Sequence, residues 1–182
     1  MNIIKNNFKK QLETERLILS PWQDNFAVDM YKNWATDTEV VKFLSWEVHE
    51  NLEETKKVVS MWVEEQTYNW CIIDKDSKEA IGSISIVKND VKNFNCEIGY
   101  CLSRKFWNKG IMTEALKKVL EFLFEEGYNT IYLKHAVENV ASGRVMQKAG
   151  MSFVCTLPQA TYLRGKFYDC NMYVMVNPNT QK

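Results

Sequence analysis

The sequence is poor in the residues that would build a metal centre. It has only 2 His, and its 5 Cys are an odd number without the Cys-x-x-Cys spacing typical of a structural zinc site. We therefore expect no bound metal and five reduced thiols, most of them buried.

An excess of charge of either sign is also missing. The 23 Lys and Arg residues balance the 23 Asp and Glu residues, so the formal net charge is zero. A neutral chain has no overall field to draw it onto nucleic acid or an anionic membrane. Partners must then be recognised by local sites, and we expect neither nucleic acid nor membrane among them.

Long apolar runs are absent as well. Residues 1–11 contain one apolar pair, Ile3 and Ile4, far shorter than the apolar core of a signal peptide, and Lys or Glu interrupts the longer helical stretches. We expect a cytoplasmic protein. Because there are no repeats or linkers, a chain of 182 residues that is 46% hydrophobic suits a single domain over residues 1–176, with a disordered polar tail at 177–182.

What the sequence does contain is a regular succession of helical and strand-like segments. A helical period of apolar residues predicts helices at 24–34, capped by Asp24, and at 36–43, 52–66, 110–126 and 139–149. Alternating or β-branched runs predict strands at 14–20, 68–74, 80–87, 94–103, 130–137, 151–156 and 167–176. This order predicts an α+β (mixed α/β) fold, in which helices cover both faces of a mixed sheet.

The strongest of these helices follows directly on a strand and a short polar loop. The segment C-E-I-G-Y-C-L-S-R-K-F-W-N-K-G-I-M-T-E-A-L runs from Cys96 to Leu116. Such a junction directs free backbone N–H groups and the positive end of the helix dipole at one point, which suits a phosphate group. Many loops of this kind bind nothing, so the junction alone leaves an anion site and an ordinary turn both open.

Five segments, taken in order, resemble one family. They are T-E-R-L-I-L at 14–19, E-I-G-Y at 97–100, W-N-K-G-I-M-T-E-A at 107–115, N-V-A-S-G-R-V-M-Q-K-A-G-M at 139–151 and the closing strand at 167–175. This set resembles the GNAT superfamily, in its ribosomal-protein-alanine acetyltransferase (RimJ/RimL-like) branch. The resemblance implies the GNAT fold with a mostly antiparallel seven-stranded sheet, acetyl-CoA as cosubstrate, no metal, and transfer of an acetyl group to a primary amine.

The loop departs from the superfamily pattern at both ends. Trp107 stands where Arg or Gln is usual, which is familiar in this branch, and Met112 stands where Gly or Ala is usual. Met112 adds bulk where the backbone must approach a phosphate closely. It leaves the preferred acyl chain open, and it is the one hint in the sequence of the alternative, a non-catalytic acyl-CoA-binding sensor or pseudoenzyme.

The resemblance also implies which residues hold acetyl-CoA. The pyrophosphate would lie on Trp107, Asn108, Lys109, Gly110, Ile111, Met112 and Thr113. The pantetheine arm would pair with Tyr100, Cys101 and Leu102, on a strand that diverges from its neighbour and turns one backbone N–H toward the thioester oxygen. Asn139 would bond the arm and Ser142 would lie near the sulfur. As plain sequence, Asn139 is a good helix N-cap and Ser142 a first-turn residue.

Amine acetylation needs a group that takes a proton, because an alkylamine is mostly protonated at neutral pH. We interpret Glu97 as this base and as part of the acceptor site, with a solvated strand carboxylate as the alternative. The resemblance implies Ser142 or Tyr173 as the acid that protonates the CoA thiolate, and Asp169 as a contact for the amine. Simple packing is the alternative for Tyr173 and Asp169.

The expected mechanism is direct attack of the amine in a ternary complex, without an acyl-enzyme. The acceptor is either a protein N-terminus or a small-molecule amine, and the sequence does not distinguish them. We expect the protein to act as a monomer or a homodimer.

Overall fold

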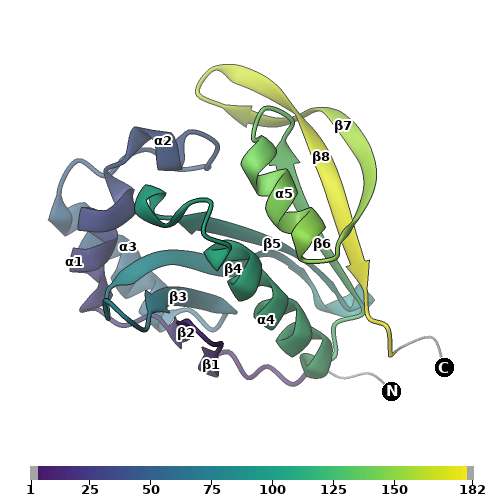
Figure 1. Cartoon of the computed structure of the whole chain (residues 1–182), viewed down its shortest axis with the longest axis horizontal. Helices are drawn as coiled ribbons and strands as arrows, with labels where there is room; N and C mark the ends of the chain where they lie inside the picture. The colour runs from purple at the N-terminus through teal and green to yellow at the C-terminus, as the bar shows by residue number, and fades with distance from the viewer. Residues whose placement is uncertain (1–3, 180–182) are drawn as a thin grey trace.

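The computed structural model describes residues 4–179, which form one eight-stranded sheet with helices on both faces (Figure 1). The strand order is β1-β2-β3-β4-β5-β6-β8-β7, and only the β5–β6 pair is parallel. The strands are β1 (Leu12–Glu13), β2 (Leu17–Pro21), β3 (Asn69–Asp74), β4 (Ala80–Asp90), β5 (Asn95–Leu102), β6 (Thr130–Ala136), β7 (Ser152–Leu163) and β8 (Lys166–Val176). The fold class is confirmed, and all seven predicted strands are present. The eighth is the two-residue β1, too short to carry an alternating pattern.

Five α-helices, one π-helix and two 3-10 turns complete the fold of residues 4–179. They are α1 (Phe26–Met30), which continues as the π-helix η1 (Tyr31–Ala35), α2 (Thr38–Val41), α3 (Leu52–Glu64), the 3-10 turns η2 (Val91–Asn93) and η3 (Arg104–Phe106), α4 (Ile111–Glu126) and α5 (Val140–Lys148). Asp37 and Asn51 cap α2 and α3 through their side chains, as polar residues at helix starts do. The predicted cap at Asp24 is wrong. The N-cap of α1 is Asn25, whose helical backbone leaves its side chain without a capping bond.

The two faces of the sheet carry two separate cores. On β3, Trp70 and Ile72 pack with Leu116 in the core beneath α4, whereas Cys71 packs with Met30 in the core beneath α1 and α3. Successive side chains of a strand point to opposite faces, so a strand covered on both sides must be apolar throughout. This explains why residues 70–73 are all apolar.

The sheet opens between its two parallel strands. β5 and β6 pair only over Asn95–Glu97 and Thr130–Tyr132, whereas the other edge of β5 stays paired with β4 as far as Leu102. From Ile98 onward, one edge of β5 is therefore not paired with β6. Its backbone N–H and C=O groups face the gap, where they need another partner.

The C-terminal segment departs from its prediction. Asn177, expected to begin a disordered tail, is buried; its backbone N–H donates to the carbonyl of Asn129 and its side-chain amide donates to the carbonyl of Tyr128. The polar sequence after Val176 could not predict these bonds, because the carbonyls that accept them come from the turn before β6. Residues 180–182 of the expected tail lie outside the described residues. Within residues 4–179, no helix is long and apolar enough to cross a membrane.

Candidate active site

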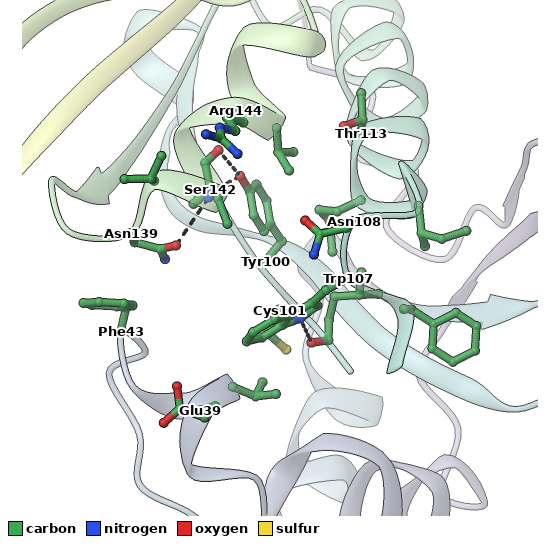
Figure 2. A pocket seen from close by; sticks show the side chains of 18 of the residues that line it. Glu39, Phe43, Tyr100, Cys101, Trp107, Asn108, Thr113, Asn139, Ser142 and Arg144 are labelled. Carbon is green, nitrogen blue, oxygen red and sulfur yellow. Dashed lines mark hydrogen bonds between the residues drawn. The ribbon is translucent and has the colours of Figure 1, made fainter. Parts of the chain in front are cut away.

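A cleft of about 590 Å³ lies where β5 leaves β6, between the N-termini of α4 and α5 and the segment that begins at α2 (Figure 2). It gathers most of the predicted acetyl-CoA residues from distant parts of the chain. These are Tyr100, Cys101, Leu102, Trp107, Asn108, Gly110, Ile111, Met112, Thr113, Asn139 and Ser142. Lys109 belongs to the same loop, but its side chain lies over the ring of Phe106 instead of lining the cleft.

The loop before α4 is shaped by two residues with left-handed backbone. Asn108 has φ of 61° and Gly110 has φ of 75°, values that Asn and Gly tolerate best. Gly110 is the N-cap of α4, and within residues 4–179 no side chain caps this helix. The first-turn N–H groups of α4 are thus left for another acceptor, at the positive end of the helix dipole. The loop has the chemistry of an anion site.

Both unusual residues of the loop have a structural explanation. The indole N–H of Trp107 donates to the carbonyl of Leu102 at 2.8 Å, which ties the loop to the end of β5. Met112 is only 5% exposed and packs in the core with Leu116 and Val119 on the inner face of α4. Its bulk is therefore largely directed into the core, as the helical spacing allows.

A polar cluster joins β5 to α5 across the cleft. The phenolic oxygen of Tyr100 lies 2.9 Å from Ser142 Oγ and donates to the Ser142 carbonyl at 3.1 Å. The side-chain oxygen of Asn139 accepts from the backbone N–H of Ser142 at 3.3 Å, so Asn139 is the N-cap of α5. Burial raises the pKa of Tyr100, more than the bond to Ser142 lowers it, and the phenol stays protonated at neutral pH.

Besides Lys109, three of the predicted site residues do not line this cleft. Glu97 alternates with the core residues Cys96 and Ile98 and therefore faces the opposite side of β5, where it pairs with Lys88 at 3.2 Å and Lys134 at 3.8 Å. These pairs keep its carboxylate near the point where the sheet opens.

The other two residues come from β8. Tyr173 is 4% exposed, its hydroxyl accepts a bond from Gln147 of α5, and its ring packs near His135. Asp169 is exposed and accepts from the backbone N–H of Gln159 on the neighbouring strand. Within residues 4–179, neither side chain forms a hydrogen bond with a residue that lines the cleft.

The structure adds a wall to the cleft that the sequence did not indicate. Glu39, Lys42, Phe43 and Leu44, from α2 and the turn after it, line the side opposite α5. Within the described part of the chain, the exposed carboxylate of Glu39 makes no hydrogen bond or ion pair, and in Figure 2 it points into the space below Phe43 and Asn139. Arg144 and Lys148 add positive charge on α5.

A sheet that opens between two parallel strands beside an uncapped helix N-terminus defines the class of acyl-CoA-dependent N-acyltransferases. The chain belongs to the GNAT acetyltransferase family, since the family described as Acetyltransferase (GNAT) domain matches residues 16–152. This confirms the fold, the family and the enzyme class predicted from the sequence.

Individual relatives agree with this assignment. The chain is 31% identical to the uncharacterized N-acetyltransferase YoaA of Bacillus subtilis, over 92% of this chain and 97% of that protein. It is 26% identical to a ribosomal-protein-serine acetyltransferase of Escherichia coli, over 90% and 94%. Among solved structures, RimL, an alpha-N-protein acetyltransferase in complex with coenzyme A, superposes with a TM-score of 0.81 at 23% identity, covering 92% of this chain and 98% of that chain. The RimJ/RimL-like resemblance is thus confirmed.

Proposed function

We propose that this protein transfers the acetyl group of acetyl-CoA to a primary amine, by direct attack within a ternary complex. One observation carries the proposal: the free edge of β5 and the uncapped N-terminus of α4 open into the same cleft. Acetyl-CoA supplies an amide-bearing arm, a pyrophosphate and a reactive thioester. The edge of β5 fits the arm, the N–H groups of residues 110–113 fit the pyrophosphate, and Arg144 and Lys148 add charge for the phosphates.

Ser142 is the proposed acid. Its hydroxyl lies at the cleft and is bonded to Tyr100, so it holds a proton beside the edge of β5 that would carry the arm. The buried position of Tyr173 on Gln147 supports Ser142 over Tyr173 for this role. The Tyr100 hydroxyl, 2.9 Å from Ser142 Oγ, orients the serine.

Glu97 remains the proposed base, acting through water. Its carboxylate lies at the last paired residue before β5 and β6 diverge, on the face opposite the α4 core. Lys88 at 3.2 Å and Lys134 at 3.8 Å hold the carboxylate at this position, where it can accept a proton from an ammonium group through water. Asp169, held by Gln159 outside the cleft, has less support as a contact for the acceptor.

The acceptor amine is proposed to lie along the wall of residues 39–44. Glu39 offers an ammonium group a carboxylate that has no partner among residues 4–179, and Phe43 and Leu44 offer apolar surface beside it. A protein N-terminus and a small-molecule amine both fit this description. The Escherichia coli relative is named for a ribosomal protein, which supports the first.

The alternative of a non-catalytic acyl-CoA sensor rested on the bulk of Met112. Since that side chain is buried in the core of α4, the alternative has lost its support. We further propose a cytoplasmic enzyme, because all five cysteines are free thiols. It is proposed to act as a monomer or a homodimer, with acetyl-CoA and the amine as its partners.

Titration calorimetry with acetyl-CoA tests the proposal. The wild type is expected to bind with micromolar affinity, and Gly110→Trp to lose binding, because a large side chain at a left-handed N-cap obstructs the loop. Acetylation is then measured on a panel of amines and, by mass spectrometry, on protein N-termini from cells with and without the gene. If the wild type does not bind acetyl-CoA, the proposed function is wrong. If it binds acetyl-CoA tightly but acetylates no amine, the protein is a non-catalytic acyl-CoA sensor instead.

A further inference from the structure

Two sequence motifs meet beside the loop at 107–113, which would bind the pyrophosphate. They are T-E-R at 14–16 and T-E-A at 113–115. The Arg16 guanidinium binds the Glu114 carboxylate through Nε at 2.7 Å and Nη2 at 2.6 Å, and through Nη1 it donates to the Lys109 carbonyl at 3.0 Å. The backbone N–H of Arg16 and the hydroxyl of Thr14 also donate to Glu114. Arg16, which directly precedes β2, thus reaches the loop before α4.

The bond to Lys109 fixes the direction of the next N–H group. The Lys109 carbonyl and the Gly110 N–H belong to one trans peptide unit, and in such a unit they point in opposite directions. Arg16 holds the carbonyl on its own side, and its Nη2 lies 3.7 Å from the position that a Cβ of Gly110 would take. The Gly110 N–H is therefore turned away from Arg16, and Gly110 lines the cleft. The guanidinium holds the peptide in this orientation before any ligand arrives.

The bonds to Glu114 remove an electrostatic conflict. Glu114 lies in the first turn of α4, so an uncompensated carboxylate there would repel an anion bound at the same helix end. Burial by itself would raise the pKa of Glu114, but the bonds from Thr14 and Arg16 outweigh burial and lower the pKa. The carboxylate is thus ionised at neutral pH, and Arg16 supplies the matching positive charge.

We infer that Arg16 is a positioning residue for acetyl-CoA: it orients the Gly110 N–H toward the cleft and neutralises Glu114 next to the bound phosphates. The inference rests on the proposed function, since the ligand is the pyrophosphate of acetyl-CoA. Arg16→Gln should raise the Kd for acetyl-CoA roughly tenfold, as expected for losing bonds from a charged group. The kcat at saturating acetyl-CoA should change much less, because Arg16 does not line the cleft.

Calorimetry of acetyl-CoA binding to four proteins tests this inference, with a thermal melt of each. Lys75→Gln is the matched control: Lys75 is a nearby cation that binds Glu13 and the Thr14 carbonyl without touching the loop. It should bind like the wild type. Glu114→Gln keeps a partner for Arg16 and removes the negative charge, so it should bind at least as tightly as the wild type.

The outcomes separate positioning from general stability. An Arg16→Gln protein with wild-type affinity overturns the inference, as does an equal loss of affinity in Lys75→Gln. If Glu114→Gln loses affinity together with thermal stability, the Arg16–Glu114 pair is merely structural and the inference is also wrong. Failure of the wild type to bind acetyl-CoA would instead overturn the proposed function and this inference with it. Hydrogen exchange of residues 107–113 without ligand gives a second readout, and it should be faster in Arg16→Gln.

Discussion

Tyr100 and Ser142, 42 positions apart in the chain, bring their oxygen atoms within 2.9 Å of each other at the point where the sheet opens. The Tyr100 hydroxyl also donates to the Ser142 carbonyl, so two contacts link the edge of β5 to the first turn of α5. We expect this contact to hold the serine where a thiolate would leave.

Ser142→Ala should therefore lower kcat by roughly a hundredfold, within the range of general acid catalysis, whereas Tyr100→Phe should cost roughly tenfold. The Kd for acetyl-CoA should change little in either protein. Steady-state kinetics and calorimetry measure the two quantities. Full activity of Ser142→Ala would remove Ser142 from the mechanism.

Glu97→Gln should lower kcat/KM by roughly a hundredfold, because an amide cannot accept the proton of the ammonium group. The loss should be smaller at high pH, where more of the amine is already neutral. Glu121→Gln, which removes an exposed carboxylate that pairs with Lys118 on α4, serves as the control. A pH–rate profile identical to that of the wild type would exclude Glu97 as the base.

The tip of the β7–β8 hairpin is bonded to residues 41–47 on one side of the cleft and to Glu138, just before α5, on the other. Arg164 donates to four carbonyls and one carboxylate at the end of α2 and in the segment after it, namely those of Val41, Lys42, Leu44, Trp46 and Glu47. Two residues on, Lys166 pairs at 2.8 Å with Glu138, which directly precedes the N-cap of α5. Phe43, on the wall itself, meets the ring of Tyr168 edge-on.

Arg164→Ala should therefore loosen the acceptor wall and raise the KM for the amine at least tenfold, while the Kd for acetyl-CoA stays the same. Limited proteolysis should cut residues 41–47 faster, because their carbonyls lose an ordering partner. Arg164→Lys should restore part of the effect, since an ammonium group cannot span all five acceptors. An unchanged KM together with unchanged proteolysis would contradict this role.

Gly143 is required by its distance to His135. A Cβ at position 143 would lie 2.6 Å from His135 Nε2, well inside contact distance, and His135 is buried, with a pKa that burial lowers. Gly143→Ala should destabilise the protein by about 1–3 kcal/mol and displace Ser142 next to it. Urea unfolding measures the change. Adding His135→Ala should recover activity by making room, and wild-type stability of Gly143→Ala alone would refute the close packing.

Glu126 anchors the N-terminal segment at the far end of α4. Its carboxylate, 2% exposed, accepts from the backbone and side chain of Asn7 and from the hydroxyl of Tyr68. Glu126→Gln should cost about 1–3 kcal/mol at neutral pH, because a buried donor is left without its acceptor.

The same group makes stability depend on pH. Burial alone would raise the pKa of Glu126, but the bonds from Tyr68 and Asn7 outweigh burial and leave it below 4.5. A carboxyl with a lowered folded pKa stabilises the protein above its ordinary value, and this contribution is lost as the pH falls through the folded pKa. Unfolding free energies measured from about pH 6 down to about pH 3 should fall more steeply in the wild type than in Glu126→Gln. Equal slopes would mean that Glu126 is not the linked group.

The sequence by itself determined the succession of strands and helices and the loop at 107–113. These features are local: each depends on the period of apolar residues or on a short run of Asn and Gly that permits left-handed turns. The order of the segments also indicated the family, because the five motifs follow one another in the order found in the GNAT superfamily.

Only the tertiary structure decided which side chains reach the cleft. Residues of a strand alternate between its two faces, and the pattern does not indicate which face meets the ligand. Tyr173 lies in the core beside His135, whereas Glu97 lies on the face of β5 opposite the core residues Cys96 and Ile98. The wall that carries Phe43 is held by Arg164, more than a hundred residues later in the chain. Such contacts form only when the β7–β8 hairpin packs at the edge of the sheet, so no local sequence pattern predicts them.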